Sequence, residues 1–291
     1  MTTDVQKQQM TTEQKDIRQR MDRIKYKILV LSGKGGVGKS TVAANLAMAL
    51  AAQGRRVGLL DVDIHGPSIP QLLGVKSSAA ELSPTDGDGS LLKPVPAGPN
   101  LTVMSIGFLL ENRDAAVIWR GPMKYNMIKQ FLKDVAWGDL DYLIVDSPPG
   151  TGDEPLSVVQ LLKSATGAVI VTTPQDLAVS DVRKCVTFCR QLALPVLGVV
   201  ENMSGFVCPT CGERVAIFKA GGGQKMAEEM NIPFLGRIPI EPCLVDAGDN
   251  GTSYLERFAG TEAACALQTV VATILETTER EEINPNGGTE K

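Results

Sequence analysis

The chain has 291 residues and a formal net charge of −4, and hydrophobic residues make up 43% of it. This hydrophobic content suffices for a sizeable core, but the charge offers no basic excess for sequence-independent binding of nucleic acid. No apolar run reaches the roughly 18 residues of a membrane span, and the polar N-terminus has no apolar signal-peptide segment. We therefore expect a cytoplasmic protein that binds neither nucleic acid nor membranes.

Strands and helices are predicted to alternate along the chain. Residues 1–24 are polar and predict a mobile arm or a solvated helix, and the Pro- and Gly-rich stretch 76–100 predicts a loop. Apolar runs predict strands at 26–32, 56–62, 101–106, 142–145, 168–171, 195–200 and 234–238. Helices are predicted at 41–52, 121–136, 154–163, 176–193, 224–230 and 259–279.

This alternation predicts a single α/β domain over residues 25–280. A strand, a helix and a second strand joined by short loops form a βαβ unit, whose strands are parallel. Repetition of the unit gives a doubly wound, mostly parallel sheet with helices on both faces. A cysteine-bearing loop at 203–220 interrupts the pattern, and the polar residues 281–291 predict a disordered tail.

The turn after the first predicted strand, residues 33–41, fits the P-loop or Walker A pattern G-x-x-x-x-G-K-[ST] in full. Its glycines let backbone N–H groups surround phosphate oxygens, and the following helix presents its positive N-terminal end to the same anion. Lys39 can reach the β- and γ-phosphates of ATP, and the Ser40 hydroxyl can bind Mg²⁺. The predicted nucleotide-binding residues are Gly33, Lys34, Gly35, Gly36, Val37, Gly38, Lys39, Ser40 and Thr41.

Carboxylates follow two of the predicted strands. Asp146 comes directly after the apolar run YLIV and can hold Mg²⁺ through a water molecule, as a Walker B residue does. Asp63 can orient the attacking water, and Gly150 can offer its N–H to the γ-phosphate from a switch loop. Asp61 is interpreted as a structural residue at a strand end, and His65, the only histidine, as a loop residue.

Lys34 adds a second cation to the phosphate loop, directly after Gly33. This lysine marks the deviant Walker A group, so the loop resembles those of the partition, septum-positioning and nitrogenase-iron-protein ATPases. In those families the lysine reaches across a dimer interface to the partner's phosphates, where it would neutralise charge as an arginine finger does. A solvated lysine with no such role is the alternative.

Cys208 and Cys211 form a C-x-x-C pair in the predicted loop at 203–220. Two thiolates at this spacing can converge on one soft metal ion or cluster, but a complete site needs four ligands and the chain has no second such pair. A symmetric partner would supply two more thiolates, enough for one [4Fe–4S] cluster or one zinc ion. A redox-active disulfide and an unliganded surface pair are the other interpretations.

The remaining four cysteines are interpreted as packing residues. Cys185 and Cys189 lie four apart on one face of a predicted helix that carries apolar residues, which favours burial. Cys243 and Cys265 are isolated in the sequence.

Several motifs together resemble the Mrp/ApbC-type iron–sulfur cluster carrier ATPases, which are P-loop proteins of the MinD-like group with the deviant Walker A loop. The matching stretches cover about residues 25–260 and read GKGGVGKSTVA, DVDIHGPSIPQLLG, WRGPMK, WGDLDYLIVDSPPGTGD, ENMSGFVCPTCGE, FLGRIPIEP and AGDNG. Two features of some relatives are missing: an additional small N-terminal domain, and a four-cysteine motif, since residues 1–100 contain no cysteine. The chain therefore resembles a minimal carrier core.

The resemblance implies a homodimer that receives a labile cluster from donor proteins and passes it to apo-proteins, with slow ATP hydrolysis required for the handover. It implies that Cys208 and Cys211 bridge a [4Fe–4S] cluster between subunits and that Asn202 contacts adenine. The other residues to which it gives roles, all at the phosphates, Mg²⁺ or the switch loops, are Lys34, Lys39, Ser40, Thr41, Asp63 and Asp146.

Two other functions stay open. A partition- or positioning-type ATPase acting as an adaptor on DNA or membrane would share the phosphate loop, but it predicts a basic surface or a basic C-terminal helix. The predicted C-terminal helix is acidic, and this function leaves Cys208 and Cys211 unexplained. An ATPase dimer bridged by a structural zinc ion would use the same cysteines without transferring a cluster.

Overall fold

The computed structural model describes residues 13–75, 91–109 and 121–283. Within them, nine strands form one sheet in the order β3-β4-β2-β5-β1-β6-β7-β8, with β9 paired to β7. The parallel strands are β1 (Ile24–Ser32), β2 (Val57–Asp61), β4 (Leu101–Ser105), β5 (Leu140–Asp146), β6 (Gly167–Thr172), β7 (Val196–Val207) and β9 (Phe234–Ile240). The short strands β3 (Val95–Gly98) and β8 (Arg214–Val215) pair antiparallel to β4 and β7.

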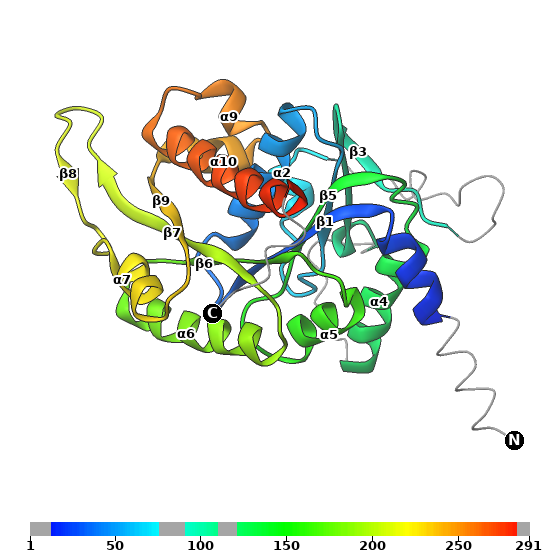
Figure 1. Cartoon of the computed structure of the whole chain (residues 1–291). Coiled ribbons are helices and arrows are strands. Elements are labelled where there is room, and N and C mark those ends of the chain that lie inside the picture. Colours follow the sequence, from blue (N-terminus) through cyan, green and yellow to red (C-terminus); the bar gives the residue numbers. More distant parts are fainter. Residues whose placement is uncertain (1–12, 76–90, 110–120, 284–291) are drawn as a thin grey trace, which may run out of the picture.

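Helices cover both faces of the sheet, which confirms the predicted doubly wound fold (Figure 1). One face carries α2 (Lys39–Ala52) and α10 (Glu262–Ile283), and the other carries α4 (Gly121–Asp134), α5 (Asp153–Leu162) and α6 (Asp176–Gln191). The smaller helices are α3 (Ile69–Leu72), the 3-10 helix η2 (Ile106–Leu109), α7 (Gly222–Glu229), α8 (Pro242–Asp249) and α9 (Tyr254–Arg257). No helix among the described residues is both long and apolar enough to cross a membrane.

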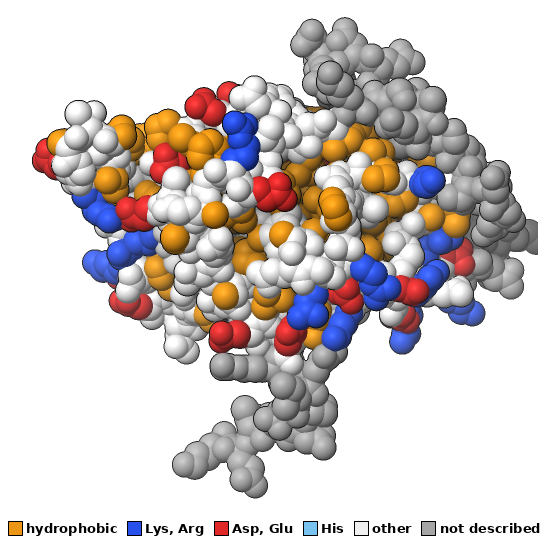
Figure 2. Space-filling view, turned by 90° about the horizontal axis from the view of Figure 1, so that it is seen from above, with side chains coloured by type: hydrophobic (Ala, Val, Ile, Leu, Met, Phe, Trp, Pro, Cys, Tyr) orange, Lys and Arg blue, Asp and Glu red, His pale blue; other side chains and the backbone are white. Residues whose placement is uncertain are grey.

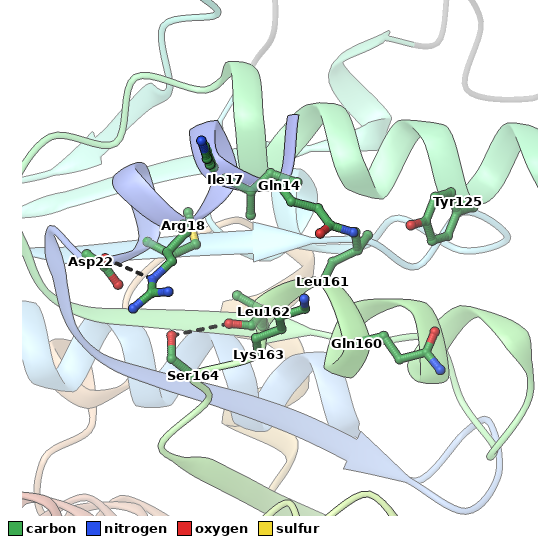
Figure 3. A pocket seen from close by; sticks show the side chains of 12 residues that line it. Gln14, Ile17, Arg18, Asp22, Tyr125, Gln160, Leu161, Leu162, Lys163 and Ser164 are labelled. Carbon is green, nitrogen blue, oxygen red and sulfur yellow. Dashed lines mark hydrogen bonds and ion pairs between the residues drawn. The ribbon is translucent and has the colours of Figure 1, made fainter. Parts of the chain in front are cut away.

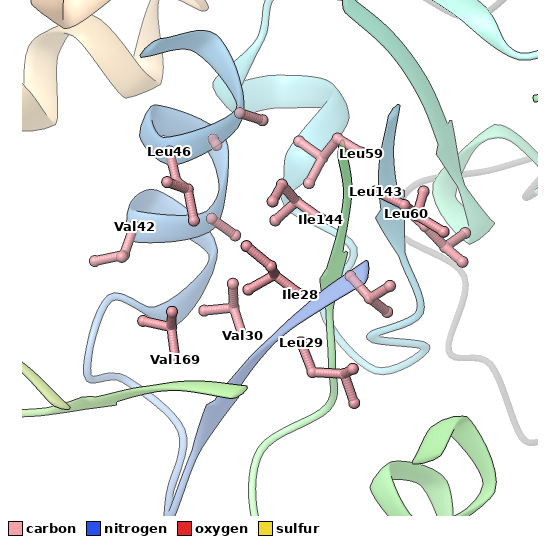
Figure 4. Close-up of a cluster of buried hydrophobic side chains, with 14 of the residues drawn as sticks. Ile28, Leu29, Val30, Val42, Leu46, Leu59, Leu60, Leu143, Ile144 and Val169 are labelled. Carbon is pink, nitrogen blue, oxygen red and sulfur yellow. The ribbon is translucent and has the colours of Figure 1, made fainter. Parts of the chain in front are cut away.

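The core lies between the central strands and these helices. In Figure 4, Val42 and Leu46 of α2 pack toward Ile28 and Val30 of β1, while Leu29 points to the opposite face of the sheet. Each of these side chains is at most 2% exposed. Strands covered on both faces are apolar throughout, which is why their sequences read as continuous hydrophobic runs.

The structure differs from the sequence prediction at both ends of the domain. Residues 13–21, part of the predicted polar arm, form a helix that packs onto the domain through buried Ile17 and Met21. The buried Lys27 ammonium donates to the carbonyls of Met21 and Ile24 at 3.1 and 2.7 Å, which satisfies the end of this helix. At the other end α10 continues to Ile283, and the rest of the predicted tail lies outside the described residues.

Strand β7 is longer than predicted and runs to Val207 instead of ending near residue 200. Its final residues pair with β8 inside the segment predicted as a cysteine loop. The elements that the sequence did not predict, α3, β3, η2, β8, α8 and α9, span two to eight residues each, too few for a periodic pattern to emerge. Residues 76–90 of the predicted loop, and Trp119 and Arg120 of the WRGPMK motif, lie outside the described residues.

Candidate nucleotide site and cysteine hairpin

The phosphate loop connects β1 to α2 and lies in close contact with two other parts of the chain. A Cβ atom at Gly33 would be 2.5 Å from the backbone carbonyl carbon of Asp181 in α6, so only glycine fits. Gly38 has φ +81°, and a Cβ there would be 2.2 Å from Nδ2 of Asn202. Close contacts with neighbouring parts of the fold therefore favour glycine at these two positions, in addition to the need to expose backbone N–H groups.

Lys39 lies at the centre of a cluster of predicted site residues. Its ammonium donates to Oδ1 of Asp146 at 2.5 Å and to the Ser40 hydroxyl at 3.2 Å, and it lies 3.7 Å from Oδ2 of Asp63. The Lys39 side chain is 6% exposed and that of Asp146 is fully buried. Burial raises the pKa of Asp146, and the Lys39 ammonium opposes this by stabilising the charged carboxylate.

The second carboxylate oxygen of Asp146 suits the predicted role at Mg²⁺. This Oδ2 atom is buried and accepts no hydrogen bond from the described residues, and the same holds for the buried Ser147 hydroxyl. Buried polar atoms are normally paired, and Mg²⁺ with its water ligands binds oxygen atoms of this kind. The residues present therefore fit a magnesium ion held by Ser40 directly and by Asp146 through water.

Asp61 has a structural environment, in agreement with its interpretation from the sequence. Its fully buried carboxylate accepts hydrogen bonds from the Ser105 hydroxyl at 2.9 Å and from the backbone N–H of Asp63 at 3.1 Å and Ile69 at 3.4 Å. Burial and the nearby charge of Asp146 raise the pKa of Asp61 to about 8. Asp61 thus fixes the loop that carries Asp63 and the start of α3.

Lys124 of α4 connects the loop that carries His65 to the start of α5, and the sequence alone did not assign it a role. Its ammonium lies 2.7 Å from Nε2 of His65 and donates to Oε1 of Glu154 at 2.5 Å. This hydrogen bond lowers the pKa of Glu154. His65 is thus a loop residue that also contacts Lys124. The sequence signal that could have pointed to this contact is the position of the two residues: Lys124 ends the WRGPMK motif, and Glu154 directly follows PPGTGD.

The other residues predicted at the nucleotide occupy less direct positions. Gly150, with φ +90°, donates its N–H to the Ser32 carbonyl at 2.8 Å, so a contact with the γ-phosphate requires this segment to move. Lys34 is half-buried and makes no ion pair within the described chain. Asn202 is 6% exposed and its amide donates to the Val37 carbonyl at 2.9 Å. The roles predicted for these three residues stay predictions.

Cys208 and Cys211 lie at the turn of the β7–β8 hairpin, which stands away from the body of the molecule (Figure 1). The turn is closed by hydrogen bonds from Cys208 N–H to the Glu213 carbonyl at 2.9 Å and from Gly212 N–H to the Cys208 carbonyl at 2.8 Å. The backbone N–H groups of Cys211 and Thr210 lower the pKa of Cys208 by stabilising its thiolate. The turn therefore favours the thiolate form of Cys208.

The described residues do not complete a metal site at this turn. Among the described residues, no group of three or more His, Cys, Asp or Glu side chains could hold a metal ion. Cys208 is half-exposed and Cys211 is exposed, so both sulfurs are accessible to ligands from outside the chain.

Three of the four other cysteines are at least partly buried. Cys185 and Cys189 are fully buried in α6, as predicted, and Cys243 is half-buried. The prediction was wrong for Cys265, which is exposed on α10. The neighbouring Ala263 and Ala264 occupy the core-facing positions of that turn and leave Cys265 on the solvent side.

A separate groove of about 770 Å³ lies between the helix at 13–21, α4 and α5 (Figure 3). Its lining includes Ile17, Leu161 and Leu162, and Arg18 pairs with Asp22 at 3.7 Å along its edge. None of the predicted site residues lines it. The candidate site is the phosphate loop with its carboxylates, together with the cysteine hairpin.

Comparisons with known proteins identify the family of this chain. The family model described as ParA, NUBPL iron-transfer P-loop NTPase, matches residues 23–275. A protein of Nematostella vectensis, the cytosolic Fe-S cluster assembly factor NUBP2 homolog, is 52% identical over 255 residues, which cover 86% of this chain and 93% of that protein.

Solved structures show the same fold. The nucleotide-binding protein of Archaeoglobus fulgidus in complex with ADP has a TM-score of 0.72 and 45% identity, over 83% of this chain and 92% of that chain. The cell division ATPase MinD of Pyrococcus furiosus has a TM-score of 0.62 at 23% identity, over 87% and 99% of the two chains, a likeness of fold alone. The chain belongs to the NUBPL-type iron-transfer P-loop NTPases.

Proposed function

We propose that this chain binds and slowly hydrolyses ATP and carries a [4Fe–4S] cluster between two copies of itself, for transfer to apo-proteins. The observation that carries the proposal is the exposed pair Cys208 and Cys211 on a hairpin of a P-loop ATPase. Two thiolates from each of two chains give the four ligands of such a cluster. The cluster is the cargo, and ATP turnover controls its handover.

The relatives support both halves of the proposal. The family model describes iron transfer, the Nematostella protein is named a cytosolic Fe-S cluster assembly factor, and the Archaeoglobus structure contains ADP. The name of the Nematostella protein also agrees with the cytoplasmic location expected from the sequence. By analogy, the partners of this chain are a second copy, cluster donors and apo-proteins that need a cluster.

The phosphate loop and its carboxylates supply the ATPase activity. Lys39 would leave Asp146 to contact the β- and γ-phosphates, and Asp146 would then be free to hold Mg²⁺ through water. The bound Mg²⁺ ion would neutralise charge that develops on the phosphates. Asp63, which lies 3.7 Å from the Lys39 ammonium, would orient the attacking water, and Lys34 would reach the phosphates of the partner subunit.

Anaerobic reconstitution with iron and sulfide tests the proposed cargo. We expect about four irons per dimer and the visible absorbance of an iron–sulfur cluster. The double variant Cys208→Ala/Cys211→Ala should hold no cluster. The matched control Cys243→Ala/Cys265→Ala, which removes two thiols outside the hairpin, should load as the unmodified chain does. Equal iron loading in the hairpin variant would contradict the assignment.

A structural zinc ion is the second candidate, because four thiolates suit zinc as well as a cluster. Metal analysis of protein purified without oxygen distinguishes the two: stoichiometric zinc with no iron would favour the zinc-bridged dimer. A partition-type adaptor has less support. Figure 2, which views the molecule from the side of α10, shows acidic and basic side chains interspersed on this face. ATP-dependent binding to DNA or liposomes would revive that function.

A further inference from the structure

We call residues 201–205 of β7 the bulge, because their pairing with β9 becomes irregular after Asn202; this segment lies between the phosphate loop and the cysteine hairpin. Asn202 pairs with Ile238 of β9, and the next pairing joins Phe206 to Ile240, so β7 advances four residues while β9 advances two. Met203 has φ +57° and Gly205 φ +82°, which turns the strand at this point. The hairpin that carries Cys208 and Cys211 starts directly after this bulge.

The bulge contacts the phosphate loop on one side. The amide of Asn202 donates to the Val37 carbonyl at 2.9 Å, and both residues are buried. A Cβ at Gly38 would be 2.2 Å from Nδ2 of Asn202 and 3.8 Å from Cε of Met203, so these side chains lie against the loop. A change in the position of the Val37 carbonyl therefore acts directly on Asn202, which precedes the hairpin by a few residues.

On its other side the bulge holds the segment through which the chain returns from the hairpin. The fully buried carboxylate of Glu201 accepts hydrogen bonds from the backbone N–H of Gly221 at 2.8 Å and of Gly223 at 2.5 Å, at the start of α7. The Ser204 hydroxyl donates to the same carboxylate at 2.6 Å. A Cβ at Gly222 would be 2.5 Å from the Pro174 carbonyl oxygen, so this segment is packed tightly against the connection between β6 and α6.

Adjacent residues of a strand point to opposite faces of the sheet, so Glu201 and Asn202 reach different neighbours from one peptide unit. Both ends of the hairpin are thus connected to the bulge. The chain enters the hairpin directly from the bulge along β7, and it leaves the hairpin through the segment before α7 that Glu201 binds. We propose that Glu201 and Asn202 are positioning residues that couple nucleotide occupancy of the phosphate loop to the position and reactivity of Cys208 and Cys211. The coupling itself does not depend on the proposed function. Only its purpose, the control of cluster release, rests on that proposal.

The coupling follows from where Val37 lies. Phosphate binding orders the N–H groups of residues 33–40, and Val37 is within this loop. Buried, close-packed side chains cannot deform continuously. A shift of the phosphate loop would therefore switch the residues that contact it from one discrete arrangement to another. The positive φ values of Met203 and Gly205 mark the point at which the hairpin can reorient relative to the sheet.

Site-resolved alkylation of the full, cluster-free chain tests the coupling. Iodoacetamide labelling of Cys208 and Cys211 is followed by mass spectrometry without nucleotide, with Mg-ADP, and with Mg and a non-hydrolysable ATP analogue. We expect nucleotide to change the labelling rate about fivefold or more, the lower end of ordinary coupling between two sites. The exposed Cys265 is the internal reference and should react at one rate throughout. The molar mass of each sample shows whether nucleotide induces a dimer. A changed labelling rate in a sample that stays monomeric comes from a change within one chain, and not from protection by a partner subunit.

Asn202→Ala should abolish this nucleotide effect. Because Asn202 is also predicted to contact adenine, the variant is expected to bind nucleotide more weakly, so the labelling is measured at concentrations that calorimetry shows to saturate it. Met203→Ala is the second variant, to be used if the first does not fold or bind; it removes a contact with the phosphate loop and should reduce the nucleotide effect, and an unchanged effect would count against the coupling. Asn250→Ala removes a similar amide-to-carbonyl hydrogen bond, to Asp246 at 2.7 Å in α8, and should keep the full effect. Glu201→Gln, which retains an acceptor but no charge, should speed labelling without nucleotide and reduce its dependence on nucleotide.

The inference is overturned if the unmodified chain labels at the same rate with and without nucleotide, or if nucleotide-bound Asn202→Ala responds as the unmodified chain does. A merely structural role for Asn202 would lower stability and leave the response intact. The Asn202→Ala dimer should still load about four irons, because its thiols are unchanged. Failure of iron loading in the unmodified chain would instead count against the proposed function, which keeps the two failures distinguishable.

Discussion

Lys39→Ala should destabilise the protein by breaking a buried ion pair, in addition to removing a phosphate ligand. The Lys39 ammonium lies 2.5 Å from Oδ1 of Asp146, and the two side chains are 6% and 0% exposed. At an effective dielectric constant of about 20, the Coulomb attraction at this distance is about 7 kcal/mol, and desolvation of both charges offsets part of it. Removing one partner of such a pair costs about 3–5 kcal/mol, because the remaining charge is buried without compensation.

The destabilisation should grow with pH. Burial raises the pKa of Asp146 above its ordinary 3.8, and without Lys39 nothing comparable opposes this, so the pKa rises further. The folded variant then keeps a proton that the unfolded chain releases above a pH of about 4, so its stability falls as pH rises toward the folded-state pKa. At acidic pH the protonated Asp146 needs no partner, and the difference from the unmodified protein should be small.

Urea denaturation of nucleotide-free protein across this pH range measures the effect. The cycle comprises the unmodified chain, Lys39→Ala, Asp146→Asn and the double variant. The double variant should recover much of the lost stability at neutral pH, because the uncompensated charge is gone, and its stability should lack the added pH dependence. The reasoning would be refuted if Lys39→Ala lowered the free energy of unfolding equally at every pH, and if its effect and that of Asp146→Asn were additive in the double variant.

Two further variants test the phosphate loop. Gly33→Ala would place a Cβ 2.5 Å from the Asp181 carbonyl carbon, so we expect about 1–3 kcal/mol of destabilisation in thermal melts and weaker ADP binding by calorimetry. Gly260→Ala, where a Cβ meets nothing within 4 Å, is its control and should behave as the unmodified chain. Lys34→Ala should spare ATP binding more than ATP turnover, since Lys34 pairs with no described residue of its own chain; equal loss of both would argue against action in trans.

The sequence determined the fold and most of the phosphate site, because the signals that carry them are local. A strand buried on both faces must be apolar throughout, and a phosphate loop needs glycines and a lysine at fixed spacing. The meeting of Lys39 with Asp63 and Asp146 was also predictable, since the carboxyl ends of neighbouring parallel strands lie at one edge of a sheet. The cysteine pair was visible as a motif, although the hairpin that presents it was not.

Only the tertiary structure decided which side chains outside these motifs contact the site. Asn202 donates to a carbonyl 165 residues earlier, and Lys124 binds Glu154 across 30 residues. Such contacts depend on strand order, on the bulge at 201–205 and on helix packing, which no local pattern encodes. The same reason explains why part of the polar N-terminal stretch packs as a helix through Ile17 and Met21, and why Cys265 faces solvent. Short elements gain their stability from such packing rather than from their own propensity, so the assembled fold alone specifies them.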